Sequence, residues 1–145
     1  MTTSVTLSAN AAQQINSILA AQAAASLLRI GVVGGGAGGV ELLLSVQYRL
    51  KNMLEKQGRT ADHLEFHLFT DQDAVLHTHN DEVSAIVARV LAERGVEVHT
   101  GHAVSSVEPG RLHCDNGSSF DLDEILWVTS AGAAPWLKES GLDVD

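Results

Sequence analysis

The sequence predicts an α/β fold in which a parallel β-sheet is flanked by helices and accompanied by a three-stranded antiparallel β-meander. Three observations lead to this prediction. Apolar strands alternate with amphipathic helices, a glycine-rich segment joins the first strand to a helix, and short strands with tight turns follow further along the chain. The 145 residues, 45% of them hydrophobic and 19% charged, suit a single globular domain with a substantial core.

This domain is expected to follow a short extension. Residues 8–27 are rich in alanine and place apolar side chains on one helical face, so residues 1–27 are predicted to be an N-terminal helical extension. Residues 28–145 then form the domain itself. The apolar face of the extension needs a partner, and pairing with a second copy of the chain, a homo-oligomer, is one expectation.

Strands and helices alternate through the first part of the domain. Residues 28–33 are a short apolar run typical of a buried parallel strand, and residues 64–69 alternate apolar and polar side chains as a second strand. Asn80 or Asp81 is expected to cap a helix, which leads to a third strand at 96–100. The side chains expected to face the core are Leu43, Val46, Leu50 and Met53 on the helix after the first strand, and Val83, Ile86, Val87, Val90 and Leu91 on the next.

The later residues predict the meander and one more buried strand. Three brief strands are divided by Pro109-Gly110 and by Asn116-Gly117, and the second pair is a strong signal for a two-residue hairpin turn. Residues 124–132 form an apolar run that ends in small residues, as expected of another parallel strand. Trp127 and Trp136 are expected to pack around this strand.

The glycine-rich segment predicts a Rossmann-like dinucleotide site. "GGGAGG" matches G-x-G-x-x-G between a predicted strand and a predicted helix, the context that this motif requires. Gly34 permits the tight turn, Gly36 lets the backbone approach a pyrophosphate, and Gly39 lets helix and strand pack closely. The free N–H groups and the positive end of the helix attract phosphate. The alternative is a glycine-rich turn without a ligand. The predicted phosphate-binding residues are Gly34, Gly35, Gly36, Ala37, Gly38 and Gly39.

The residue that holds the adenosine ribose is less well defined. An acidic residue is expected at the end of the second strand, where the chain has Thr70, Asp71 and Asp73. We select Asp71, with the alternative that it only starts the turn. No Arg or Lys lies between Arg59 and Arg89 to meet a 2′-phosphate, which favours NAD(H) over NADP(H).

Composition argues against several classes of function. Nine Lys and Arg against 18 Asp and Glu give a net charge of −9, so no nucleic-acid partner is expected. Cys114 is the only cysteine, which rules out an internal disulfide. His77 and His79 lack a third ligand in sequence, and we assign no metal. No secretory signal or long apolar run is present, which predicts a cytoplasmic protein.

Several segments resemble a known family. "GVVGGGAGGVEL", "AERGVEVHTGHAVSSVEPG" and "DEILWVTSAGAAPWL" are similar to the NAD(H)-binding domain of pyridine nucleotide-disulfide oxidoreductases, over about residues 28–142. They look most like type II NADH dehydrogenase-like flavoproteins, including the oxidoreductase half fused to selenide, water dikinase. That family inserts an NAD(H) domain into an FAD domain, and Glu41 matches the "GxGxxGxE" of its NAD(H) domain.

The resemblance implies a role for each matched residue. It places the glycines at the pyrophosphate and Glu41 near the nicotinamide, facing a flavin. Ala131 and Gly132 would lie beside the cofactor, where the chain returns to the FAD domain. Thr70 stands where many relatives have a ribose-binding Glu, and Ser130 departs from the common "ATG" at this point.

The resemblance also implies an FAD-dependent NAD(P)H oxidoreductase. This chain would present NAD(H) to a flavin held by the FAD domain of the same parent chain, and alone it would be inactive, with no catalytic acid, base or nucleophile of its own. The electron acceptor stays open among a quinone, a disulfide and a selenium compound. The alternative is a regulatory nucleotide-sensing Rossmann domain without redox chemistry, which needs the same glycines and no flavin.

Overall fold

A computed structural model describes residues 27–128, in which two helices and seven strands follow one another much as the sequence predicts. The predicted helix at 8–27 (apart from its last residue), the last residues of the predicted strand at 124–132, and Trp136 lie outside the described residues. The elements are β1 (Leu28–Val33), α2 (Ala37–Lys56), β2 (Leu64–Phe69), α3 (Asp81–Glu93), β3 (Val96–His99), β4 (Val104–Glu108), β5 (Arg111–Cys114), β6 (Ser119–Asp121) and β7 (Glu124–Trp127).

The main sheet has four parallel strands in the order β3-β2-β1-β7. The strands β4, β5 and β6 form a separate antiparallel sheet. This arrangement confirms the predicted fold class, a Rossmann-like parallel sheet with an antiparallel meander. Both turns of the meander have the expected chemistry: Gly110 and Gly117 have φ of 80° and 85°, and the Asn116 side chain accepts a hydrogen bond from the N–H of Ser118 at 3.0 Å.

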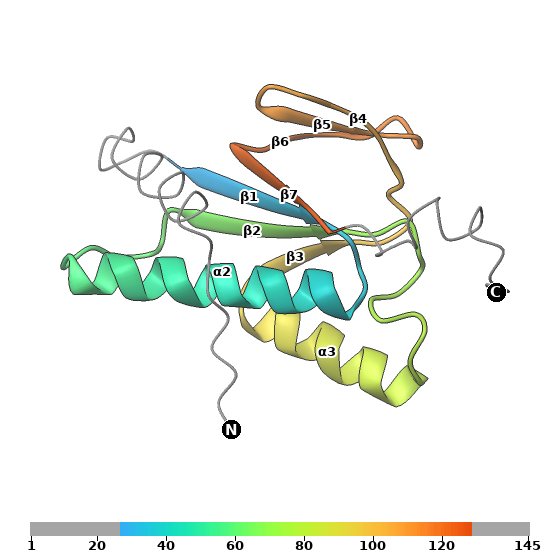
Figure 1. Ribbon diagram of the computed structural model, residues 1–145, viewed down its shortest axis with the longest axis horizontal. Coiled ribbons are helices and arrows are strands. Elements are labelled where there is room, and N and C mark those ends of the chain that lie inside the picture. Colours follow the sequence, from blue (N-terminus) through green and yellow to red (C-terminus); the bar gives the residue numbers. More distant parts are fainter. Residues whose placement is uncertain (1–26, 129–145) are drawn as a thin grey trace, which may run out of the picture.

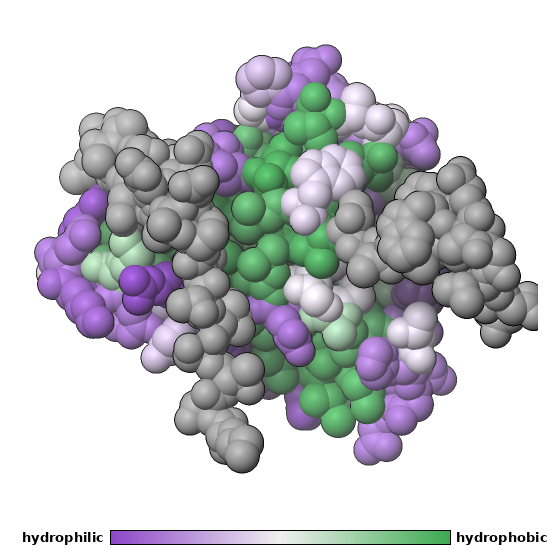
Figure 2. All heavy atoms as spheres, viewed as in Figure 1, coloured by the Kyte–Doolittle hydropathy of each residue, from purple (hydrophilic) through white to green (hydrophobic). Residues whose placement is uncertain are grey.

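The molecule has three layers. Figure 1 shows α2 and α3 on one side of the parallel sheet and the meander on the other. Alternate strand residues therefore enter two different cores: Phe66 and Leu68 of β2 pack toward the helices, whereas Phe69 packs with Leu112 and Leu122 beneath the meander. Apolar residues also reach the surface in the middle of the face drawn in Figure 2, with polar residues around them.

Aromatic rings join the meander to the sheet. The ring of Phe69 lies 4.5 Å from that of His99 and 4.9 Å from that of Phe120, measured between centroids. His99 and Phe120 are also 4.5 Å apart. These three rings come from β2, β3 and β6, so contacts among them fix the meander over the parallel sheet.

Three details of the predicted packing differ in the structure. Ile86 was expected in the core and is 45% exposed, because Ser84 faces inward there and donates a hydrogen bond to the Leu76 carbonyl. Trp127 was expected to pack and is 53% exposed. On α2, Leu54 is fully buried, whereas Met53 is only partly so. Periodicity identifies the buried side of a helix but not the loop that packs across one end of it.

The start of α3 has the predicted cap. The Asn80 side chain accepts a hydrogen bond from the N–H of Val83 at 2.9 Å, and Asp81 and Glu82 lie in the first turn, where the helix dipole favours negative charge. Neither α2 nor α3 has the length and apolarity that crossing a bilayer requires.

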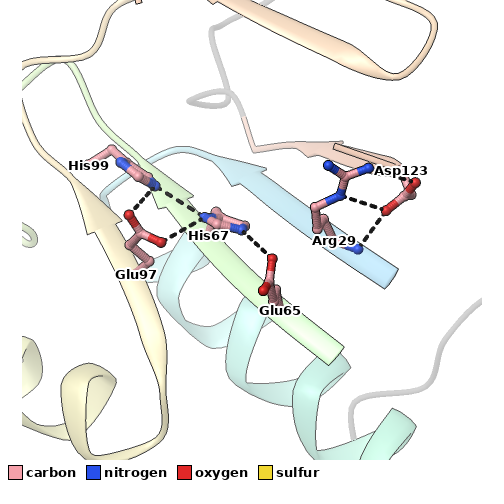
Figure 3. A network of polar contacts seen from close by, with 6 residues as sticks. All are labelled: Arg29, Glu65, His67, Glu97, His99 and Asp123. Atoms are coloured by element: carbon pink, nitrogen blue, oxygen red, sulfur yellow. Dashed lines mark hydrogen bonds and ion pairs between the residues drawn. The ribbon is translucent and has the colours of Figure 1, made fainter. Parts of the chain in front are cut away.

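An ion pair connects β1 to the turn before β7. The Asp123 carboxylate accepts hydrogen bonds from the backbone N–H of Arg29 at 2.8 Å and from its Nε at 3.2 Å (Figure 3). Burial would raise the pKa of Asp123, but the hydrogen bonds from the side chain and backbone of Arg29 outweigh it and hold that pKa below its usual value. The pair therefore stabilises the ionised carboxylate at the place where β7 joins the sheet.

Asp123→Asn is expected to lower the free energy of unfolding by about 1–2 kcal/mol at neutral pH, because charge-assisted hydrogen bonds are lost. A lowered folded-state pKa gives stability that is present above the ordinary value of 3.8 and is lost as the pH falls through the folded value. Urea unfolding from neutral pH to about pH 3 should therefore show the gap between wild type and variant closing. The exposed Asp62→Asn serves as control, and a gap independent of pH would contradict the role of the charge.

Candidate nucleotide-binding site

The glycine-rich segment lies at the carboxyl edge of the sheet, where strand order reverses. The chain passes from β1 through α2 to β2 on one side, and β7 pairs with β1 on the other. Ligands of open α/β sheets bind in the crevice at such a switch point. The segment from Gly34 to Gly39 thus occupies the place that the fold favours for a ligand (Figure 1).

Two glycines allow α2 to start directly beside β1. Gly34 has φ of 139°, a conformation that side chains disfavour, and a Cβ there would lie 2.6 Å from the carbonyl oxygen of Val128. A Cβ on Gly39 would overlap the carbonyl oxygen of Gly34. Only glycine at both positions lets the helix begin this close to the strand.

Gly36 is surrounded by open space. It is the N-cap residue of α2, it has extended backbone angles, and a Cβ on it would meet no atom within 4 Å. In the described part of the chain no side chain caps this helix, and its first turn holds no acidic residue. The exposed backbone at Ala37 and Gly38, together with the positive end of a 20-residue helix, thus offers free N–H donors to an anion.

Thr70 and Asp71 lie at the end of β2 but face different surroundings. Thr70 is 4% exposed, its side chain fills the space above Gly35, and its Oγ1 accepts a hydrogen bond from the N–H of Gln72 at 3.2 Å. Asp71 is exposed. Of the two predicted ribose-side residues, only Asp71 presents its polar group to solvent, whereas Thr70 supports the glycine segment.

A shallow hollow of about 250 Å³ brings several of these residues together. It opens at the carboxyl ends of β1, β2 and β7 and reaches the start of the meander. Its walls include Gly34, Thr70, Asp71, His102, Trp127 and Val128. Trp127 was not predicted to belong to this site. Its ring is exposed because it lies in the wall of this hollow, at the edge of the sheet.

The loop after β2 is fastened to the glycine segment by one residue. The N–H of Leu76 donates to the Gly35 carbonyl at 2.8 Å, and its own carbonyl accepts from the N–H of His79 and from Oγ of Ser84. Leu76 has φ of 54°, unusual for a branched side chain, yet it is 7% exposed and packs in the core. Burial and three hydrogen bonds hold this strained residue in place, so the loop and the glycine segment form one rigid edge.

The remaining predicted site residues are only partly described. Glu41 is exposed on the second turn of α2, close to the glycine segment. Ala131 and Gly132 lie outside the described residues. The described chain ends at Val128, whose N–H donates to the carbonyl of Val33 at 2.9 Å, so β7 leads directly toward the glycine segment.

The structure contains a second polar cluster that was not predicted from the sequence. His67 on β2 and Glu97 and His99 on β3 lie together on the meander side of the sheet (Figure 3). Burial lowers the pKa of both imidazoles, and the nearby Glu97 opposes this. The sequence did contain an indication of this cluster: in "EFHLF" and "VEVHT", acidic residues and histidines alternate with apolar residues along both strands. Only strand pairing shows that these residues meet.

The sheet order and the position of the glycine segment define an α/β domain of the Rossmann-like class. The chain belongs to the pyridine nucleotide-disulphide oxidoreductase family, whose family model matches residues 5–145. It is thus a member of a family of oxidoreductases, as the resemblance predicted.

Individual relatives agree with this assignment. The external alternative NAD(P)H-ubiquinone oxidoreductase B1 of Solanum tuberosum mitochondria is 25% identical over 114 residues, which cover 74% of this chain and 20% of the relative. Among solved structures, NDH2 of Plasmodium falciparum in complex with NADH aligns with a TM-score of 0.63 at 16% identity, over 72% of this chain and 23% of that one.

A second similar structure is putidaredoxin reductase in its covalent complex with putidaredoxin. It aligns with a TM-score of 0.62 at 20% identity and covers 96% of this chain and 31% of that one. At these identities the two solved structures establish the fold alone. The chain spans about a fifth of the length of the plant relative and less than a third of either of these two structures.

Two neighbouring glycines give a matched test of the helix–strand contact. Gly39→Ala is expected to lower the free energy of unfolding by about 2 kcal/mol or more, because its methyl group overlaps the Gly34 carbonyl. Gly38→Ala should be at least as stable as wild type, since its methyl group would be only in ordinary contact with Val128 at 3.4 Å, and Ala favours helix. Urea unfolding of both variants measures the difference, and equal stabilities would disprove the close approach.

Proposed function

We propose that this chain is the NAD(H)-binding domain of an FAD-dependent pyridine nucleotide oxidoreductase. The observation that supports this most directly is the open space at Gly36, next to the uncapped N-terminus of α2 and at the switch point of the sheet. A pyrophosphate fits this combination of free N–H groups, helix dipole and open space at Gly36. The same place in the sheet is where dinucleotides bind in folds of this class.

The redox role draws on family membership and on the lengths of the relatives. The chain is far shorter than the relatives it matches, and one structural relative is in complex with NADH. An FAD domain of the same parent chain is therefore the proposed partner, with Glu41, Ala131 and Gly132 on the side that faces it. Type II NADH dehydrogenases are the proposed subgroup, and a parent fused to selenide, water dikinase stays a prediction. Family membership favours this role over the nucleotide sensor that the sequence left open.

In this proposal the chain binds and orients the dinucleotide and supplies no acid or base for the reaction. The N–H groups at the start of α2 hold the pyrophosphate, and Asp71 lies where an acidic side chain accepts hydrogen bonds from a ribose. Bound NADH would supply the hydride. Leu76 and Thr70 keep the edge rigid, so the nicotinamide is directed the same way in each encounter with a flavin domain.

NAD(H) is the proposed cofactor in preference to NADP(H). Asp71 and Asp73 are both exposed beyond β2, and no Arg or Lys lies between Arg59 and Arg89 to neutralise a 2′-phosphate. A carboxylate at this position repels that phosphate and accepts hydrogen bonds from the free ribose hydroxyls of NAD(H). The name of the plant relative covers both NADH and NADPH, so the preference for NAD(H) rests on the residues of this chain and not on the family.

Replacing Gly36 separates binding from folding. Gly36→Val should still fold, because the backbone there is extended and no atom lies near its Cβ, with the unfolding midpoint lowered only by the poorer N-cap preference of Val. It should lose NADH binding, since the side chain occupies the pyrophosphate's space. Calorimetric titration measures the binding, for which a lone domain is expected to reach a dissociation constant near the millimolar range, about −4 kcal/mol.

The control for this titration is Ala92→Val, an exposed position near the end of α3 at the opposite edge of the sheet. It should bind NADH as the wild type does. Unchanged binding by Gly36→Val would disprove the proposed pyrophosphate site, and tighter binding of NADPH than of NADH would overturn the choice of cofactor.

Redox activity is expected to require the proposed FAD domain in addition to this chain. The purified chain should retain no FAD and should not oxidise NADH in the presence of a quinone, because hydride transfer here needs two bound cofactors and the chain has one nucleotide fingerprint. Glu41→Gln should leave NADH affinity almost unchanged. The visible spectrum after incubation with FAD and the loss of NADH absorbance test this, and a yellow protein with steady NADH turnover would show that the chain is a complete enzyme.

A further inference from the structure

The cluster of His67, Glu97 and His99 lies apart from the glycine segment, on the meander side of the sheet. Nδ1 of His67 is 3.2 Å from Nε2 of His99. One carboxylate oxygen of Glu97 is 3.6 Å from the same Nδ1, and the other is 3.8 Å from the same Nε2. Figure 3 shows the three groups converging from adjacent strands. Strand pairing sets this geometry, because Glu97 pairs with His67 and His99 pairs with Phe69.

These distances match the spacing of ligands around a small cation. Zinc bonds to imidazole nitrogen and carboxylate oxygen at about 2.0–2.1 Å, so neighbouring ligand atoms of a tetrahedral site are about 3.3 Å apart. Two imidazoles and one carboxylate form a donor set of the catalytic-zinc type, which leaves a fourth position for water. The donors also have the required softness, since imidazole suits zinc and other late transition metals better than magnesium or calcium.

A hydrogen bond between the two histidines accounts for only part of this arrangement. Such a bond uses Nδ1 of His67 and Nε2 of His99 but leaves Nε2 of His67, which is buried and has no hydrogen-bond partner in the described part of the chain. The nearest acidic oxygen to that atom belongs to Glu65, at 3.9 Å. If Nδ1 is a metal ligand, Nε2 bears the proton and points toward Glu65. Histidine ligands are commonly oriented by a carboxylate in this way.

We propose that His67, Glu97 and His99 form a binding site for a divalent zinc-type cation, with Glu65 orienting His67. Glu97 is two-thirds exposed, so solvent reaches the site and a cation has a path of entry. Two of the three ligands belong to β3, a four-residue strand at the edge of the sheet in the described chain, and the third belongs to β2. A bound cation would therefore tie this edge strand to the sheet and raise its stability.

Direct titration with zinc tests the site on the full chain with any affinity tag removed. The wild type is expected to bind one equivalent of Zn²⁺, and its unfolding midpoint should rise with zinc concentration, because the folded state alone presents the three ligands together. Cobalt serves as a second probe, since Co²⁺ in a tetrahedral N/O site gives visible absorption bands. Absence of a stoichiometric zinc site, or binding that leaves the midpoint unchanged, would overturn the proposal.

Glu97→Gln is the main variant because its exposed side chain can change without disturbing the fold. It should weaken zinc binding by about tenfold or more, and Glu65→Gln should weaken it within the range of about 10–100-fold that is typical of orienting partners. The matched control is the double variant His77→Gln/His79→Gln, which removes the exposed histidine pair of the loop and should bind zinc as the wild type does. Equal affinity in Glu97→Gln and wild type, or loss of binding in the loop variant, would place the zinc elsewhere.

The two sites can be distinguished in the same preparations. Glu97→Gln should bind NADH as the wild type does, because its side chain is not among those that line the hollow at the glycine segment. Gly36→Val should bind zinc normally. A variant that loses both ligands together would indicate a single shared site and contradict the proposal.

Discussion

The contact between the backbone of Gly39 and the carbonyl of Gly34 determines how this domain is built. It sets the distance between α2 and β1, and any side chain at position 39 would enlarge it. Because the helix begins there without a cap, its first N–H groups remain available and lie at the carboxyl edge of the sheet. The loop after β2 is then secured to the same edge by the hydrogen bond from Leu76 to Gly35. The packing of α2 on β1 and the free N–H groups of the proposed phosphate site are thus consequences of one local constraint.

The two faces of the parallel sheet carry different kinds of side chains. One face packs on the helices through the aliphatic side chains of β1, β2 and β3, which form the larger core. The other face combines a smaller core under the meander, built around Phe69, with polar residues that include His67 and Glu97. Since strand residues alternate between faces, the same three strands supply both surfaces. The glycine segment, the proposed nucleotide site, belongs to neither face and lies at the carboxyl edge of the sheet.

The carboxyl edge of the sheet and its meander side therefore contribute different chemistry. At the carboxyl ends, backbone N–H groups and a helix dipole suit a phosphate, and the side chains need only stay clear. On the meander side of β2 and β3, side chains from adjacent strands meet across the pairing and suit a cation. Membership of the pyridine nucleotide-disulphide oxidoreductase family supports the first use and says nothing of the second. The second site depends on the positions of two histidines and a glutamate in neighbouring strands.

The sequence by itself determined the elements, their order, and the place of the glycine segment between β1 and α2. It did so because these features depend on local preferences: apolar periodicity, glycine at turns and an asparagine cap at Asn80. Only the tertiary structure decided which candidates face a ligand. It buries Thr70 against Gly35, exposes Trp127 at the hollow and brings His67 next to His99, 32 positions away. Such contacts arise from strand pairing and from a loop that crosses a helix end. Both bring together residues that are distant in the sequence, and local sequence preferences do not indicate which of them will meet.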